Sequence, residues 1–219
     1  MTCLSNPIWF RISGFAGAVF AVLGAVIAAA GYRGKAGEPY SPFNHFISEL
    51  GEVGVSRLAV AFNLGLIFSG VALIPKTNSL GLVLSGWVAK LGMAAGVICA
   101  VSLALVGVFP MNRIKLHGKA AVAYFRSGLA MVVLFSIAIA SQPADGAVLA
   151  RGYALAGLPP ILSFGSFLVL IGRAYKETDE PLEADEGAKR PRFWILAVVE
   201  WLVFLTVLLW FLVIAQGLG

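Results

Sequence analysis

The chain has 219 residues, of which 59% are hydrophobic and only 12% are charged, and its formal net charge is +5. A soluble domain carries about twice this share of charged residues, so the composition excludes an ordinary soluble protein. The basic residues gather at the ends of long apolar segments, which makes anionic lipid head groups, and not nucleic acid, the expected partner of the positive charge.

Six apolar segments approach or exceed the length that crosses the roughly 30 Å hydrocarbon core of a bilayer as a helix. We therefore predict an all-α integral membrane bundle that forms a single domain over residues 1–219. Pro75 and Pro110 are expected to end the second and third spans. The first segment is too long for a signal-peptide core and is predicted to be a retained span. The predicted spans are 8–31, 58–75, 82–108, 119–141, 150–173 and 193–216.

Six spans place both termini on the same face of the membrane. We call the opposite face, which carries loops 32–57, 109–118 and 174–192, side A, and the face of the termini side B. Side A holds eleven Lys and Arg residues and side B three, one of which is Lys76. The positive-inside rule then predicts a cell-membrane protein with side A in the cytoplasm and the termini outside. The charged segment 176–192 is expected to be a solvated loop.

The stretch between the first two spans has the pattern of a short amphipathic helix. Its apolar residues recur at helical spacing, at Phe43, Phe46, Ile47 and Leu50. Its polar residues fall on one arc of the same helix, at Asn44, His45, Ser48, Glu49 and Glu52. We predict a separate helix over 42–51 that lies at the membrane surface with its polar side free, and a hydrogen bond between His45 and Glu49.

Several polar groups lie inside the predicted spans, at similar depths from side A. Arg126 and Glu200 are the costliest, so they are expected to face the interior and to pair with each other. Asn63 and Ser102 lie at comparable depth. Lys90 enters from side B and is predicted to extend to that interface.

The loop after the third span adds Arg113, Lys115 and His117, whose charges suit a phosphate or a carboxylate. Together with the preceding groups they predict one shared polar site on side A. The candidate ligand-binding residues are Asn44, His45, Ser48, Glu49, Asn63, Arg113, Lys115, His117, Arg126 and Glu200.

Three ordered motifs resemble an uncharacterised prokaryotic membrane family that is catalogued as domain of unknown function 998. They are Asn44 with Ile47-Ser48-Glu49-Leu50-Gly51, Phe62-Asn63 with Gly65-Leu66-Ile67, and Val106-Gly107-Val108-Phe109-Pro110 with His117. The resemblance covers roughly residues 10–140 and extends loosely to the end. It implies a six-helix membrane protein and marks the same polar positions, but it supplies no activity.

Three functions remain open at this point. The first is binding of a lipid or other anionic amphiphile in a polar pocket at one interface. The second is a lipid hydrolase or acyltransferase, with Ser48 as nucleophile, His45 or His117 as base and Glu49 as the orienting carboxylate. The third is a small-solute or proton-coupled transporter that uses Glu200 and Arg126, with a kink at Pro159-Pro160 in the fifth span.

No cofactor is predicted. Two histidines do not match the membrane hydrolases that hold zinc with three, so no metal site is expected. Haem between His45 and His117 is disfavoured because neither lies within an apolar span. The expected partners are membrane lipids. A second copy could pack against small-residue faces such as Gly92-x-x-x-Gly96, although packing inside the bundle is the preferred reading of that pair.

Overall fold

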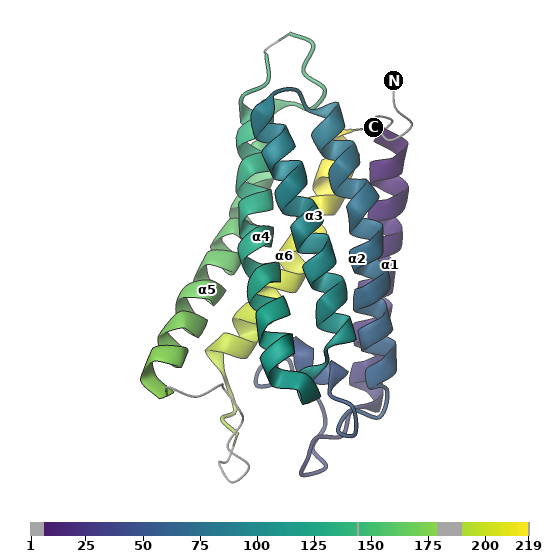
Figure 1. Cartoon of the computed structure of the whole chain (residues 1–219), viewed down its shortest axis with the longest axis vertical. Coiled ribbons are helices and arrows are strands. Elements are labelled where there is room, and N and C mark those ends of the chain that lie inside the picture. The colour runs from purple at the N-terminus through teal and green to yellow at the C-terminus, as the bar shows by residue number, and fades with distance from the viewer. Residues whose placement is uncertain (1–6, 144, 179–189, 219) are drawn as a thin grey trace.

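The computed structural model describes residues 7–143, 145–178 and 190–218. Across these ranges the chain forms a bundle of six long helices, as predicted (Figure 1). Short 3₁₀ helices lie in the connections, and no strand longer than an isolated bridge occurs in the described part. The long helices are α1 (Pro7–Gly31), α2 (Ala59–Val83), α3 (Trp87–Val108), α4 (Ile114–Ala140), α5 (Leu158–Thr178) and α6 (Ile195–Gly217).

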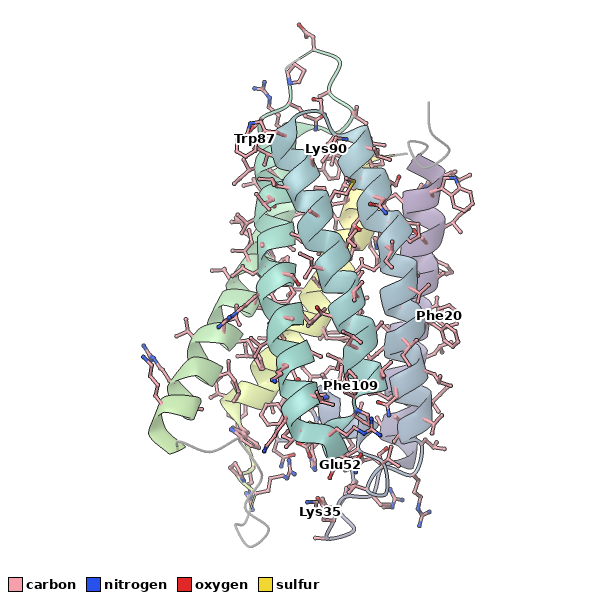
Figure 2. The ribbon with its side chains drawn as sticks, viewed as in Figure 1. Phe20, Lys35, Glu52, Trp87, Lys90 and Phe109 are labelled. Atoms are coloured by element: carbon pink, nitrogen blue, oxygen red, sulfur yellow. The ribbon has the colours of Figure 1, made fainter. Side chains whose placement is uncertain are left out.

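All six helices are long and apolar enough to span a membrane. Their outer faces carry large apolar side chains, among them Phe15 and Leu162, which are 67% and 68% exposed. Phe20 projects outward from α1 in the same way (Figure 2). So much exposed apolar surface is unfavourable in water and favourable in lipid. The chain is therefore a multi-pass membrane protein.

Both described ends of the chain lie at one end of the bundle, and the loops of side A lie at the other (Figure 1). Lys35, Glu52 and Phe109 mark side A, whereas Trp87 and Lys90 mark side B (Figure 2). Helices α1 to α4 pack in chain order, and α6 packs against α1 and α5. Helix α5 packs against α4 as well but diverges from it toward side A (Figure 1).

The second span is longer than predicted. Helix α2 continues through Pro75 to Val83, so Lys76 lies inside the helix and not in a side B loop. Proline is tolerated in membrane-spanning helices because neighbouring helices and hydroxyl side chains satisfy the backbone groups that it leaves free. The third span correspondingly begins at Trp87 and not at residue 82.

The two prolines predicted to kink the fifth span lie where a 3₁₀ helix passes into an α-helix. Pro159 and Pro160 lie in the first turn of α5, directly after the 3₁₀ helix η4 (Arg151–Gly157). A proline in the first turn interrupts no helical hydrogen bond, because the N–H groups there have no partner within the helix.

The Gly92 and Gly96 pair serves packing within the bundle. A Cβ on Gly92 would lie 3.1 Å from the ring of Phe135 on α4, and one on Gly96 would lie 2.5 Å from Thr77 on α2. The two glycines therefore let α3 approach both neighbouring helices closely.

Candidate functional site

The segment between α1 and α2 folds against the side A end of the bundle. The helix predicted over 42–51 is wrong. Ser41 accepts backbone hydrogen bonds from Asn44 and His45 in a turn, and the 3₁₀ helix η2 (Ile47–Gly51) follows. Every residue of η2 is buried. The side chains of His45, Ser48 and Glu49, which were expected to face solvent, are therefore buried.

Two side chains of the bundle hold η2 in place. The Glu200 carboxylate on α6 accepts a hydrogen bond from the backbone N–H of Ile47 at 2.7 Å. The Asn63 amide on α2 donates to the backbone oxygen of Gly51 at 3.0 Å. Any side chain at position 51 would collide with Asn63. Asn63, predicted as a ligand-binding residue, thus contacts the backbone of η2.

Glu49 forms the strongest ion pair described at this end of the bundle. Its two carboxylate oxygens accept hydrogen bonds from the two terminal nitrogens of Arg190, both at 2.9 Å, and the Glu49 side chain is only 7% exposed. The backbone N–H of Phe46 and the hydroxyl of Tyr32 also donate to Glu49. Burial lowers the pKa of Arg190, but the hydrogen bonds and charge of Glu49 outweigh it, so the pKa lies above its usual value. The guanidinium therefore stays charged.

Sequence reasoning missed Arg190 because it was assigned to a solvated linker. Residues 179–189 of that linker lie outside the described part of the chain. Arg190 donates to the backbone oxygen of Asn44 at 2.8 Å, and the Asn44 amide donates to that of Pro191 at 3.1 Å. The backbone N–H of Trp194 donates to Phe43. The sequence gives no signal for this pair, because Glu49 was predicted on a solvent-facing side and its burial is evident only in the folded structure.

His45 does not bind Glu49, contrary to the prediction. It is 2% exposed, packs edge-on against Tyr32 at 5.3 Å, and its Nε2 lies 3.7 Å from a carboxylate oxygen of Glu38. Burial raises the pKa of Glu38, but backbone hydrogen bonds and the contact with His45 outweigh it, so the pKa falls below its usual value. The hydroxyl of Tyr40, also in this cluster, accepts from Trp201 on α6 at 2.8 Å.

Three of the predicted residues line one internal cavity of about 50 Å³: Ser48, His117 and Glu200. The Ser48 hydroxyl faces the Glu200 carboxylate. His117 Nδ1 lies 2.8 Å from the backbone oxygen of Phe109. A carbonyl oxygen only accepts, so Nδ1 carries the proton and Nε2 is left as a base. The cavity has room for a few water molecules.

Arg126 and Glu200 do not pair, and the single shared site is not formed. Arg126 is exposed on the face of α4 opposite the buried positions Phe125 and Gly128, whereas Glu200 faces the interior. One helical residue turns the side-chain direction by about 100°, so equal depth in two spans does not fix a common direction. Arg113, in the 3₁₀ helix η3 (Met111–Arg113), is exposed and belongs to neither place.

Arg126 lines a shallow, open hollow of about 470 Å³ on the outer face of α4, together with Lys115 and Lys119, and every residue that lines it belongs to this helix. Its other lining residues are Ile114, Gly118, Val122 and Ala123. No carboxylate lines the hollow, and within the described ranges none of the three cations has an acidic partner. An anion with an apolar portion would complement this surface.

Within the described ranges, no three His, Cys, Asp or Glu side chains gather closely enough to ligate a metal ion. The hydrogen-bonding groups at side A are of two kinds. Glu49, Asn63 and Glu200 bind other groups of the folded chain. The three cations on the outer face of α4 have no acidic partner among the described residues.

Comparison with known families assigns the chain. The model of the family described as "Protein of unknown function (DUF998)" matches residues 15–217, so the chain belongs to this family. No curated protein and no solved structure matches it. The motif residues on which the resemblance rests, from Asn44 through Asn63 to His117, lie at side A around η2.

Proposed function

We propose that this DUF998 family member binds a lipid with an anionic head group on the outer face of α4. The observation that carries the proposal is the hollow of about 470 Å³ whose polar lining consists of Lys115, Lys119 and Arg126. Positive charges on a membrane-facing surface are costly unless they reach the head groups or bind an anion. A lipid phosphate satisfies both requirements.

The spacing of the three cations fits a molecule that enters the bilayer. Lys115 lies at the start of α4, and Arg126 lies about 16 Å further along the helix, at about 1.5 Å per residue. Arginine binds phosphate through two parallel hydrogen bonds, whereas lysine acts as a compact point charge. The head group would contact the lysines, with its phosphate or glycerol region nearer Arg126.

The lining between the cations favours a ligand over cations that merely extend to water. Gly118, Val122 and Ala123 have small side chains, and they leave the hollow open beside the charges. Helix α5 diverges from α4 toward this end of the bundle (Figure 1). An acyl chain would then lie along the apolar surface of the bundle.

Native mass spectrometry of the detergent-solubilised protein tests the proposal, with added phosphatidylglycerol or phosphatidylcholine as probes. The test variant replaces Lys115, Lys119 and Arg126 by glutamine. The matched control replaces three other exposed side A cations that do not line the hollow, Arg57, Arg113 and Arg173. Both variants lose the same charge.

The wild type and the control should retain phosphatidylglycerol in preference to phosphatidylcholine, and the test variant should lose the preference. Equal retention of the two lipids by the wild type, or equal loss in both variants, would contradict the proposal. Competition by glycerol phosphate distinguishes a site for an intact anionic lipid from a site for its phosphate head group alone. If it displaces the lipid completely at matched concentration, the site binds the head group alone.

We further propose that side A faces the cytoplasm, where anionic lipids are abundant. The support is the excess of basic residues on side A, which persists although Lys76 no longer counts for side B. Single cysteines at Arg113 and Asp145, both exposed, report the two sides in a Cys3→Ser background. An impermeant thiol reagent should label intact cells at position 145 only. Labelling at position 113 would reverse the orientation.

The cavity shared by Ser48, His117 and Glu200 favours a lipid hydrolase or acyltransferase as the second candidate. The Nε2 base of His117 could activate the Ser48 hydroxyl if the two meet during a reaction. A fluorophosphonate probe tests this directly. Enzymatic activity predicts labelling of the wild type that Ser48→Ala and His117→Ala abolish, with phosphatidylglycerol retention unchanged. An unlabelled wild type would remove the candidate.

A further inference from the structure

Lys76 is a buried lysine that the candidate lipid site does not use. It lies in α2, seven residues before the helix ends at Val83, and it is 4% exposed. Its Cα is therefore about 10 Å from the side B end of the helix, within the membrane-spanning length of α2. A charge at this depth requires a compensating group.

No acidic side chain in the described spans is near this amine. Within those spans Glu200 is the only acidic residue. The Lys76 amine lies 3.5 Å from the ring centre of Phe211, also on α6. Glu200 and Phe211 are eleven residues apart on that helix, about 16 Å along its axis. An ion pair between Lys76 and Glu200 is therefore ruled out by distance.

The surroundings accommodate the amine specifically. A Cβ on Gly14 of α1 would lie 2.6 Å from Nζ of Lys76, so a larger residue at position 14 would displace the end of the lysine side chain. The rings of Phe211 and Phe10 contact the amine on other sides, with the Phe10 centre 5.2 Å away. These cation–π contacts stabilise a positive charge, but they are weaker than the hydration that the ammonium loses on burial.

A hollow of about 40 Å³ adjoins the amine, and Lys76, Gly14, Ser13 and Ser69 are among the residues that line it. The Ser13 hydroxyl is engaged, because it donates to the backbone oxygen of Trp9. The Ser69 hydroxyl makes no hydrogen bond within the described part of the chain. A cation and a free hydroxyl donor thus border a space that holds a few water-sized particles.

We propose that this hollow binds a small monovalent anion of about the size of chloride, with Lys76 as its counter-charge and Ser69 as a hydrogen-bond donor. The site is separate from the lipid hollow on α4, since the two share no residue. The anion supplies the negative charge that the helices lack. A divalent anion such as sulfate would leave an uncompensated negative charge beside the single Lys76 amine, so a monovalent anion is favoured.

Equilibrium binding of radioactive chloride to the detergent-solubilised protein, in sodium gluconate buffer, tests the proposal. The wild type should bind chloride saturably, and nitrate but not sulfate should compete. Lys76→Met removes the charge and should abolish binding. Lys90→Met is the matched control, because Lys90 is exposed near the same end of the bundle. It should bind as the wild type does.

Gly14→Ala provides a second variant, which keeps the charge and reduces the space, and it serves if Lys76→Met does not fold. It should weaken chloride binding. Chloride should raise the melting temperature, relative to gluconate at equal ionic strength, most in the wild type and Lys90→Met. The rise should be smaller in Gly14→Ala and absent in Lys76→Met. The proposal is overturned if the wild type binds no chloride saturably, if Lys76→Met binds as the wild type does, or if sulfate competes as well as nitrate.

Discussion

The two groups of charges at side A differ in how they are neutralised. Glu49 and Glu200 lie inside the bundle, and each has a partner from a distant segment: Arg190 for the first and the backbone of Ile47 for the second. Arg126 on the outer face of α4 has no such partner in the described structure. Charges that the fold itself satisfies stabilise the fold, and charges that it leaves unsatisfied are where a ligand is to be sought.

The inner group also explains how a polar loop can close the end of a membrane bundle. The loop places backbone N–H groups and a carboxylate where little water reaches them, which is unfavourable unless each is bonded. Asn63 and Glu200 bond the backbone of η2, and Arg190 neutralises Glu49. The side A end is therefore held together by these polar contacts as well as by an apolar cluster that includes Tyr32, Leu50 and Phe62.

The largest effect is expected from Arg190→Gln. It leaves the Glu49 carboxylate buried without its counter-charge, which should lower the free energy of unfolding by about 3 kcal/mol. Thermal unfolding in detergent measures the loss. The double variant with Glu49→Gln should recover part of it, since the unpaired charge is then gone. Arg192→Gln, two residues away and exposed, is the control. An equal loss in the control would show that the ion pair does not stabilise the fold.

A smaller effect is expected at Glu200. Glu200→Leu leaves the Ile47 N–H buried and unbonded, which should cost about 2 kcal/mol. Glu200→Gln keeps an acceptor oxygen and should cost less. Neither change should alter retention of phosphatidylglycerol, because Glu200 lies in a different cavity from the lipid hollow. Loss of phosphatidylglycerol retention in Glu200→Gln at unchanged melting temperature would show that the inner charges and the cations on the outer face of α4 form one site.

The outer group should contribute little to folding. Replacing Lys115, Lys119 and Arg126 by glutamine should change the free energy of unfolding of lipid-free protein by less than about 0.5 kcal/mol per residue, as is usual for exposed positions. Urea or detergent titration of delipidated protein measures this. A loss as large as that of Arg190→Gln would show that these cations have partners in the folded chain and would sharply weaken the lipid proposal.

The smallest effects concern pH, through two carboxyls outside the spans. The pKa of Glu38 is lowered, so its contribution to stability is complete above about 4.5 and is lost as the pH falls through the folded value. Burial, partly offset by Lys35, raises the pKa of Glu52, so its contribution declines as the pH rises above about 4.5. Glu38→Gln should reduce the loss of stability in acid, and Glu52→Gln should slightly stabilise near neutrality. Melting temperatures from about pH 3 to pH 7 measure both. If both substitutions changed the melting temperature at pH 7 in the same direction, the assignments of Glu38 and Glu52 would be contradicted.

The prediction that side A gathers the polar groups was useful for some residues and wrong for others. Ser48, His117 and Glu200 do line one cavity, and the loop at Asn112 does contact the first loop, by paired hydrogen bonds with Val53. The helix predicted over 42–51 is replaced by a turn and the 3₁₀ helix η2. Its polar residues found partners inside the bundle, and those partners, not the local pattern, decided the conformation.

The sequence alone determined the membrane class, the six helices and which loops share one face of the membrane. Length and hydropathy are local properties of each segment, and an even number of spans returns the chain to the face where it began. Only the tertiary structure decided that α2 continues past Lys76, that Arg190 neutralises Glu49, and that Arg126 faces outward. These facts depend on how each helix is rotated about its axis and on which distant segments meet. Helices α2, α3 and α6 are apolar on nearly all sides, so no apolar stripe fixes their rotation, and packing against neighbouring helices sets it instead.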